Sequence, residues 1–110
     1  MNYVNKETEY KLVTNANKAI EKTDVNYFKL KYCHCSSGED RWSYPLFRVA
    51  NREAMNKVAT ALLNAGIACN TDVYIDEDGD DSRGRPMLRY VYSVEMRDVI
   101  CEPRLNLYTN

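Results

Sequence analysis

The sequence has 110 residues, of which 45% are hydrophobic and 28% charged, with a formal net charge of -1. This length suits one domain with a real hydrophobic core, and the composition argues against wholesale disorder. The near-neutral charge singles out neither nucleic acid nor a membrane surface as the partner. No apolar run approaches the ~20 residues of a membrane span, and residues 1–7 lack the apolar core of a signal peptide. We therefore expect a cytoplasmic protein.

Two segments have the apolar spacing of amphipathic helices. The apolar stripe of the first helix, over about residues 8–22, consists of Leu12, Val13, Ala16, Ala19 and Ile20. That of the second, over residues 51–65, consists of Met55, Val58, Ala59, Leu62 and Leu63. Asn51 can cap the second helix by accepting from the free amides of its first turn, and Gly66 suits the left-handed backbone that ends many helices.

Four segments are rich in aromatic and β-branched residues and are predicted to be strands. They are residues 25–35, 44–49, 67–75 and 87–96. Residues 36–40 break the first hairpin, and Asp78-Gly79 is a favoured tight-turn pair for the second.

The order α-β-β-α-β-β predicts a single α+β domain over residues 1–98. Strand 44–49, helix 51–65 and strand 67–75 form a right-handed crossover, and the last strand inserts between the two parallel ones. The first hairpin then places strand 25–35 on the outer edge. The expected fold is a four-stranded antiparallel sheet with two helices on one face, a permuted ferredoxin-like sandwich. Residues 99–110 form a C-terminal tail that can lie at a sheet edge or add a strand to a partner.

Two short sequences recur along the chain. Thr-Asp-Val at residues 23–25 returns at 71–73, and the proline-led segment 45–49 resembles 86–91. Such a repeat agrees with an architecture of two related halves, although chance similarity remains the alternative.

Five acids gather after the third predicted strand: Asp76, Glu77, Asp78, Asp80 and Asp81. Without them the chain has 15 basic and 11 acidic residues, a charge of +4. An EF-hand count from Asp76 puts Asp81 where glycine is needed and Met87 where a bidentate acid is needed, so a calcium loop is not predicted. We expect a solvated hairpin tip balanced by Arg83 and Arg85, with docking onto a basic protein surface as the alternative.

The segment Cys33-His34-Cys35 contains typical zinc ligands. A regular strand sends His34 to the face opposite Cys33 and Cys35, so the three cannot hold one ion or form an activated nucleophile. A site from all four cysteines, which include Cys69 and Cys101, lacks paired Cys-x-x-Cys spacing. We therefore expect thiols without a metal or cofactor.

Catalytic motifs are absent from the sequence. There is one histidine, and the four glycines form no phosphate-binding loop. The sequence therefore predicts no catalytic residues and no enzyme activity.

The leading hypothesis is a small interaction protein that binds, and thereby inhibits or modulates, a larger protein or nucleoprotein. Small plain domains of this kind are common among phage and mobile-element accessory proteins, including anti-defence inhibitors, which act in the host cytoplasm. The five acids would steer the encounter with a basic patch. Aromatic side chains dominate interface energies, and the candidate anchors are Trp42, Tyr44, Tyr74 and Tyr108.

A nucleic-acid-binding domain is the alternative. Basic and aromatic residues on the predicted helix-free sheet face could hold phosphates and stack bases: Tyr27, Lys29, Lys31, Arg48 and Arg89. The glycine-aromatic signature of an RNA-recognition motif is missing from the central strands. A homodimer built through the same sheet face is a third possibility, so the chain is expected to be a monomer or a homodimer.

Overall fold

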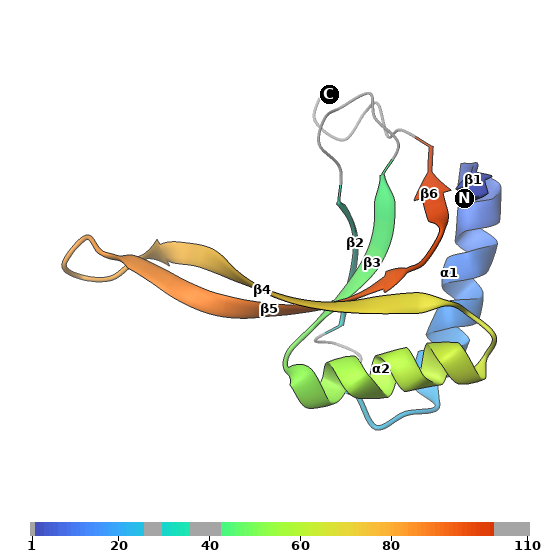
Figure 1. Cartoon of the computed structure of the whole chain (residues 1–110), viewed down its shortest axis with the longest axis horizontal. Coiled ribbons are helices and arrows are strands. Elements are labelled where there is room, and N and C mark those ends of the chain that lie inside the picture. Colours follow the sequence, from blue (N-terminus) through green and yellow to red (C-terminus); the bar gives the residue numbers. More distant parts are fainter. Residues whose placement is uncertain (1, 26–29, 36–42, 103–110) are drawn as a thin grey trace.

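The computed structural model describes residues 2–25, 30–35 and 43–102 (Figure 1). In these residues it has two helices and six strands, which confirms the predicted α+β class. The elements in chain order are β1 (Asn2–Val4), α1 (Lys6–Glu21), β2 (Lys31–Cys35), β3 (Tyr44–Val49), α2 (Arg52–Asn64), β4 (Cys69–Asp80), β5 (Pro86–Met96) and β6 (Val99–Cys101). Neither helix is both long and apolar enough, within the described residues, to cross a membrane.

The larger sheet has four strands in the order β2-β3-β5-β4, and every neighbouring pair is antiparallel. Phe47 in β3 lies opposite Tyr32 in β2 on one side and Val94 in β5 on the other. Because side chains alternate along a strand, these three residues share one face of the sheet. Both β2 and β4 are edge strands of this sheet, so within the described residues each has a neighbouring strand on one side only.

Both helices pack against the sheet face that carries Phe47. The core they form with the sheet consists of Ala16, Ile20, Phe47, Val49, Met55, Val58, Ala59, Leu62 and Val94. This set contains residues from both apolar stripes and from the alternating positions of β3 and β5. The predicted combination of two helices with a multi-stranded antiparallel sheet is thus present.

Side-chain caps determine where the helices begin. Asn51 Oδ1 accepts a hydrogen bond from Ala54 N at 2.8 Å, as predicted, and Gly66 follows α2 with a φ of 80°. Asn5 Oδ1 accepts in the same way from Thr8 N at 2.9 Å. The first helix therefore begins at Lys6, earlier than the expected start near residue 8, because Asn5 satisfies a first-turn amide.

A second, two-stranded sheet joins the beginning of the described chain to its end. β1 and β6 pair in parallel, with Val4 opposite Cys101. The sequence did not predict β1. Of the predicted tail, residues 99–102 are described, and residues 103–110 lie outside the described chain. Ser43 and Cys101 exchange two backbone hydrogen bonds, Ser43 N to Cys101 O at 3.0 Å and Cys101 N to Ser43 O at 2.8 Å. These bonds attach β6 to the chain immediately before β3.

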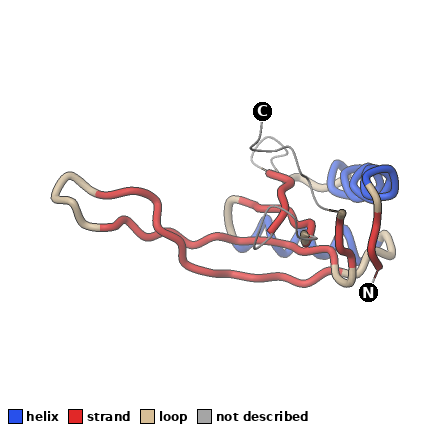
Figure 2. Tube along the Cα trace, turned by 90° about the horizontal axis from the view of Figure 1, so that it is seen from above, coloured by secondary structure: helices blue, strands red, loops and turns tan. Residues whose placement is uncertain are grey.

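The β4–β5 hairpin extends well beyond the helices as a two-stranded ribbon (Figures 1 and 2). We call residues 75–90 the arm. The predicted end of the third strand near residue 75 and the turn at Asp78-Gly79 are wrong. β4 continues to Asp80, with a register shift between Glu77 and Asp80 at which Gly79 has a φ of 77°. The positive φ at Gly79 is accommodated within the bulge, so it does not reverse the chain.

The chain reverses instead between Asp81 and Arg85. Asp81 Oδ1 accepts from Arg83 N at 2.8 Å and from Arg85 N at 2.9 Å, and Asp81 N donates to Arg85 O at 2.8 Å. The Arg85 Nε–Asp81 Oδ2 ion pair, at 3.2 Å, provides part of the predicted charge balance at the tip. Gly84, with a φ of 75°, supplies the left-handed position in this turn.

Candidate functional site

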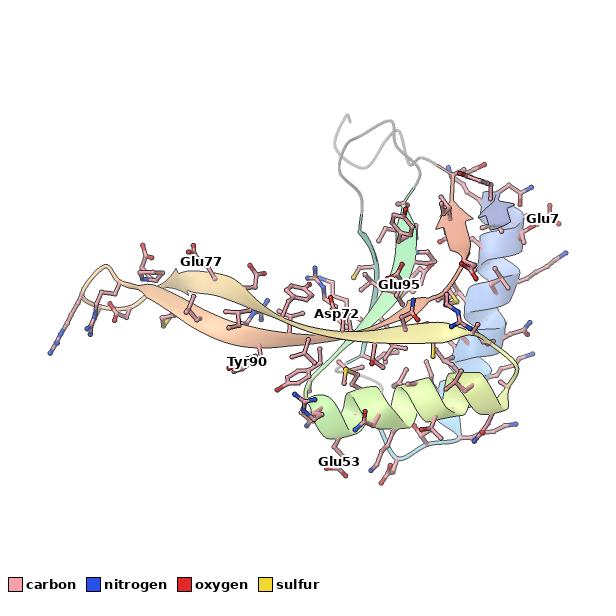
Figure 3. The ribbon with its side chains drawn as sticks, viewed as in Figure 1. Glu7, Glu53, Asp72, Glu77, Tyr90 and Glu95 are labelled. Atoms are coloured by element: carbon pink, nitrogen blue, oxygen red, sulfur yellow. The ribbon has the colours of Figure 1, made fainter. Side chains whose placement is uncertain are left out.

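In the arm, the sheet face that packs against the helices continues beyond the region that the helices cover. Val73 pairs with Tyr92, and both pack against the core, whereas the next pair on that face, Ile75 and Tyr90, is 57% and 64% exposed. Leu88, which follows on the same face, is 65% exposed. Among the described residues, neither α1 nor α2 covers this part of the sheet (Figure 3).

The five acids are spread along the arm, so the predicted acidic loop is wrong. Asp76 lies opposite Arg89, while Glu77 lies opposite Leu88 on the apolar face. Asp80 ends the strand and Asp81 forms the turn, and only the backbone of Asp78 is described. The amides of Arg85 and Arg83 hold the pKa of Asp81 below its usual value. Because β4 is an edge strand, most of these acids border a backbone edge that no other strand of the described residues pairs with.

The two predicted aromatic anchors that the structure describes, Tyr44 and Tyr74, do not come together. Tyr74 is half-buried opposite Val91, near the base of the arm, whereas Tyr44 is exposed at the start of β3. The register of β3 against β5 runs from Leu46 opposite Glu95 to Val49 opposite Tyr92, so Tyr44 lies toward the end of the sheet away from the arm. Trp42 and Tyr108 lie outside the described residues.

The helix-free sheet face is electrostatically mixed over the described residues. A row across the sheet contains Lys31, Arg48, Ser93 and Asp72 in register, and Glu95 lies in the next row. Burial, and then the negative charge of Asp72, raise the pKa of Glu95. Leu46, Val91 and Ser93 on this face are buried.

The basic residues of the nucleic-acid alternative are therefore not gathered into one patch in the described chain. Arg89 belongs to the arm, where it pairs with Asp76. Lys31 and Arg48 share their face with two carboxylates. Tyr27 and Lys29 lie outside the described residues.

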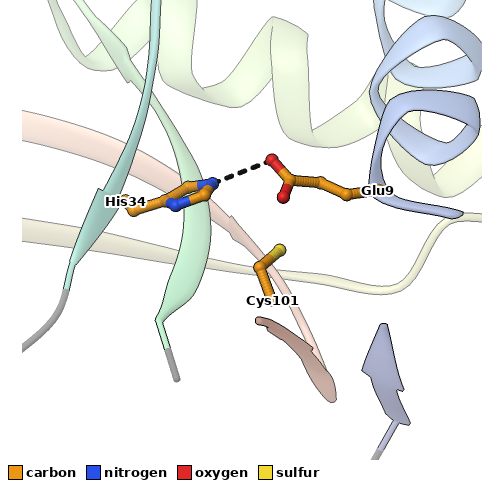
Figure 4. Close-up of side chains that lie close together, drawn as sticks. All are labelled: Glu9, His34 and Cys101. Atoms are coloured by element: carbon orange, nitrogen blue, oxygen red, sulfur yellow. Dashed lines mark hydrogen bonds and ion pairs between the residues drawn. The ribbon is translucent and has the colours of Figure 1, made fainter. Parts of the chain in front are cut away.

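A buried polar cluster joins α1, β2 and β6, and the sequence analysis did not predict it (Figure 4). His34 Nε2 lies 2.9 Å from Glu9 Oε2, and His34 Nδ1 lies 3.0 Å from Ser43 Oγ. The Tyr32 hydroxyl donates to Glu9 Oε2 at 3.0 Å. Cys101 completes the cluster, since its Sγ, a His34 ring nitrogen and a Glu9 oxygen all lie within 4.8 Å of one another.

Each member of the cluster is held by regular structure. Glu9 lies in the first turns of α1, where its amide donates to Asn5 O at 2.9 Å. Alternation along β2 points both Tyr32 and His34 toward this helix, in a T-shaped contact with ring centroids 5.5 Å apart. Cys101 is fixed by its backbone bonds to Ser43. The side chains are thus positioned before any ligand arrives.

A cavity of about 330 Å³ adjoins the cluster. It is lined by Lys6, Glu9, Tyr10, Val13 and Tyr32. Glu9 and Tyr32 therefore border both the buried cluster and an opening between α1 and β2.

The cluster has the order of a nucleophile–base–acid relay, from Ser43 through His34 to Glu9. Ser43 is only 4% exposed and is fixed by two backbone hydrogen bonds to Cys101. Its Oγ is therefore not presented at the surface of the described residues, where the nucleophile of such a relay meets its substrate. The imidazole, carboxylate and thiol are instead a donor set typical of a transition-metal ion.

One signal for the cluster was present in the sequence. Glu9 precedes Leu12, Val13 and Ala16 by three, four and seven residues, so it lies on the apolar stripe of α1. A carboxylate on that stripe indicates a buried polar partner. No sequence pattern identified His34 as the partner of Glu9 or placed Cys101 beside the two. Along β2, alternation places Cys33 on the sheet face away from His34, as predicted. Cys33, Cys69 and Cys101 are thiols in the structure.

None of the protein families, curated proteins and solved structures with which the chain was compared matches it.

Proposed function

We propose that this chain is a non-enzymatic interaction protein that binds a larger protein through the arm and modulates it by occupying its surface. The observation that carries this proposal is the continuation of the core face onto the arm, where Ile75, Leu88 and Tyr90 are all more than half exposed. A two-stranded ribbon is marginally stable by itself, and contiguous exposed apolar side chains are typical of interaction sites. A partner would cover this face in the way that α2 covers Val73 and Tyr92.

The charge of the arm indicates the chemistry of the partner. Residues 75–90 contain five acids and three arginines. Four of the acids lie in β4, whose outer backbone edge has no neighbouring strand in the described sheet. Like charges disfavour pairing with the β4 strand of a second copy, whereas a basic segment could add to this edge as a further strand. We therefore infer a larger protein with a basic surface as the partner, in the setting of a phage or mobile-element accessory protein.

Two finer points belong to the same proposal. The strand order β2-β3-β5-β4, with both helices on one face, supports a permuted ferredoxin-like sandwich. Cys33, Cys69 and Cys101 are thiols, which suits a reducing compartment such as the cytoplasm.

The test is affinity capture from bacterial lysate, with and without nuclease, using the wild type and an arm variant. The variant carries Ile75→Ser, Leu88→Ser and Tyr90→Ser. A matched control carries Tyr10→Ser and Leu63→Ser, because these large side chains are also exposed but lie on the helices. We expect a discrete protein band that survives nuclease, persists with the control and is lost with the arm variant.

Binding of the captured protein to purified chain then tests the role of charge. Replacing the five acids by serine is expected to weaken binding and to flatten its dependence on salt. Unchanged affinity at low and high salt removes the acids from the interface, and equal capture by the arm variant overturns the proposal. A band that disappears after nuclease and requires Lys29 and Lys31, tested by substitution with glutamate, would establish the nucleic-acid alternative. Light scattering that shows a dimer dissociated by the arm substitutions would assign the arm to self-association.

A further inference from the structure

We propose that Glu9, His34 and Cys101 form a binding site for one Zn²⁺ ion. The three residues come from α1, β2 and β6, and their ligand atoms already lie within 4.8 Å of one another (Figure 4). This inference is independent of the arm, which belongs to a different part of the molecule.

The donor atoms match the preferences of zinc. Imidazole nitrogen, thiolate sulfur and carboxylate oxygen are its common protein ligands, at about 2.0–2.3 Å from the ion. Tetrahedral geometry at these bond lengths places the donor atoms about 3.4–3.6 Å apart. Glu9 Oε2 and His34 Nε2 are 2.9 Å apart in their hydrogen bond. They need to separate by only about 0.5 Å, and the ion would replace the shared proton.

The neighbours of the cluster are those that orient metal ligands. A ligating histidine usually hydrogen-bonds through its other ring nitrogen, and a ligating carboxylate is itself hydrogen-bonded. Here His34 Nδ1 is 3.0 Å from Ser43 Oγ, and the Tyr32 hydroxyl donates to Glu9 Oε2 at 3.0 Å. With zinc on Nε2, the ring proton resides on Nδ1 and is donated to Ser43 Oγ. The serine hydroxyl can serve as acceptor in this state and as donor without the ion, because it rotates.

Charge and access also favour the ion. Cys101 is 0% exposed and Glu9 is buried, so deprotonation of Cys101 for metal binding would place a thiolate beside a carboxylate, two buried negative charges that a divalent cation stabilises. Zn²⁺ neutralises both. The cavity lined by Glu9 and Tyr32 gives the ion a route from the surface and leaves space for water at a fourth coordination position.

The experiment uses the full chain after treatment with a chelator. Zn²⁺ is titrated calorimetrically, and Co²⁺ serves as a spectroscopic probe because Co²⁺–thiolate bonds give a charge-transfer absorption band. We expect one equivalent to bind and the band to appear. The band should be lost in Cys101→Ser and retained in Cys33→Ser and Cys69→Ser, which are the matched controls.

Substitutions of the other residues separate ligands from positioning groups. Glu9→Gln and His34→Gln are expected to weaken Zn²⁺ binding by at least about 100-fold, whereas Ser43→Ala should weaken it about 10- to 100-fold and keep the thiolate band. The wild type provides a test that needs no variant. Binding displaces the Cys101 thiol proton, so affinity should fall by about tenfold for each unit of decreasing pH, and zinc should raise the melting temperature reversibly.

Three outcomes would overturn the proposal. They are the absence of a thiolate band at one equivalent of Co²⁺, a band that survives Cys101→Ser, and a band that is lost in Cys33→Ser or Cys69→Ser. If Cys101→Ser does not fold, the pH dependence and the zinc-induced rise in melting temperature of the wild type decide the question.

Discussion

Ile75 and Tyr90 face each other across the β4–β5 hairpin, one pair beyond the last pair that touches the helices. The pair before them, Val73 and Tyr92, packs against the core. The boundary between buried and exposed apolar residues therefore runs between consecutive pairs on one face of the same two strands. We therefore expect substitutions of exposed side chains in the arm to change the free energy of unfolding of the domain very little.

Leu88→Ser should change the free energy of unfolding by less than about 0.5 kcal/mol, because Leu88 lies in the exposed arm. Leu62→Ala, at a fully buried position in α2, should cost about 2–5 kcal/mol through lost burial and a residual cavity. Urea denaturation measures both. A loss above about 1 kcal/mol for Leu88→Ser would show that the arm packs against its own domain.

Asn51→Ala should destabilise the domain by about 1 kcal/mol, because it leaves the Ala54 amide without its capping oxygen. Asn56→Ala is the control, since Asn56 is exposed in the interior of α2, where alanine is the better helix former. Thermal unfolding followed by circular dichroism compares the two. Equal effects would contradict a specific role for the cap.

Glu95→Gln should raise the free energy of unfolding at pH 7 and leave it nearly unchanged at pH 3. Burial and Asp72 raise the pKa of Glu95 above its ordinary value of 4.5, so folding favours the protonated carboxyl. The resulting stabilisation is present below pH 4.5 and is lost as the pH rises through the folded-state pKa. The glutamine side chain is uncharged at every pH, so in the variant this stabilisation is not lost as the pH rises.

Denaturation curves at several pH values measure this effect. In a background of Asp72→Asn the gain from Glu95→Gln should be smaller, because one cause of the raised pKa has been removed. A variant that is less stable than the wild type at pH 7 would contradict the prediction.

Asp81→Ala should open the tip of the arm, because the Asp81 carboxylate accepts from the amides of Arg83 and Arg85. Amide chemical shifts of these two residues in NMR spectra are expected to move toward random-coil values. Asp80→Ala is the control, since Asp80 lies at the end of β4 and precedes the turn. Unchanged shifts in Asp81→Ala would show that the turn does not depend on this carboxylate.

The parts of the fold that follow from local periodicity were predictable. The apolar stripes of both helices correctly identified Ala16, Ile20, Val58 and Leu62 as residues that face the core. Asn51 and Gly66 are correctly placed at the ends of α2, because capping depends on nearby residues. These features require no knowledge of distant contacts.

The extension of β4 through Asp80 was not predictable in the same way. Asp and Gly are depleted in strands, so residues 76–80 read as a loop. Pairing with β5 overrides this preference, as in the match of Asp76 with Arg89. β1 was missed because three residues carry little periodic signal.

The buried cluster depends on contacts between residues far apart in the chain. Alternation showed that His34 faces away from Cys33, but it did not show what His34 faces. Glu9 and Cys101 reach it only because α1 packs beside β2 and because β6 bonds to Ser43. Such a site emerges from tertiary structure and has no fixed spacing in sequence.

The pairing of β1 with β6 has a consequence for the order of folding. Val4 lies opposite Cys101, so this contact closes almost the whole described chain into one loop. Contacts of such large sequence separation form slowly, because much chain entropy is lost before they are made. During synthesis, α1 and the first strands emerge long before Cys101. A zinc ion at Glu9, His34 and Cys101 would therefore bind only after the sheet has formed. Because its bonds would form late in folding, it would slow unfolding more than it speeds folding.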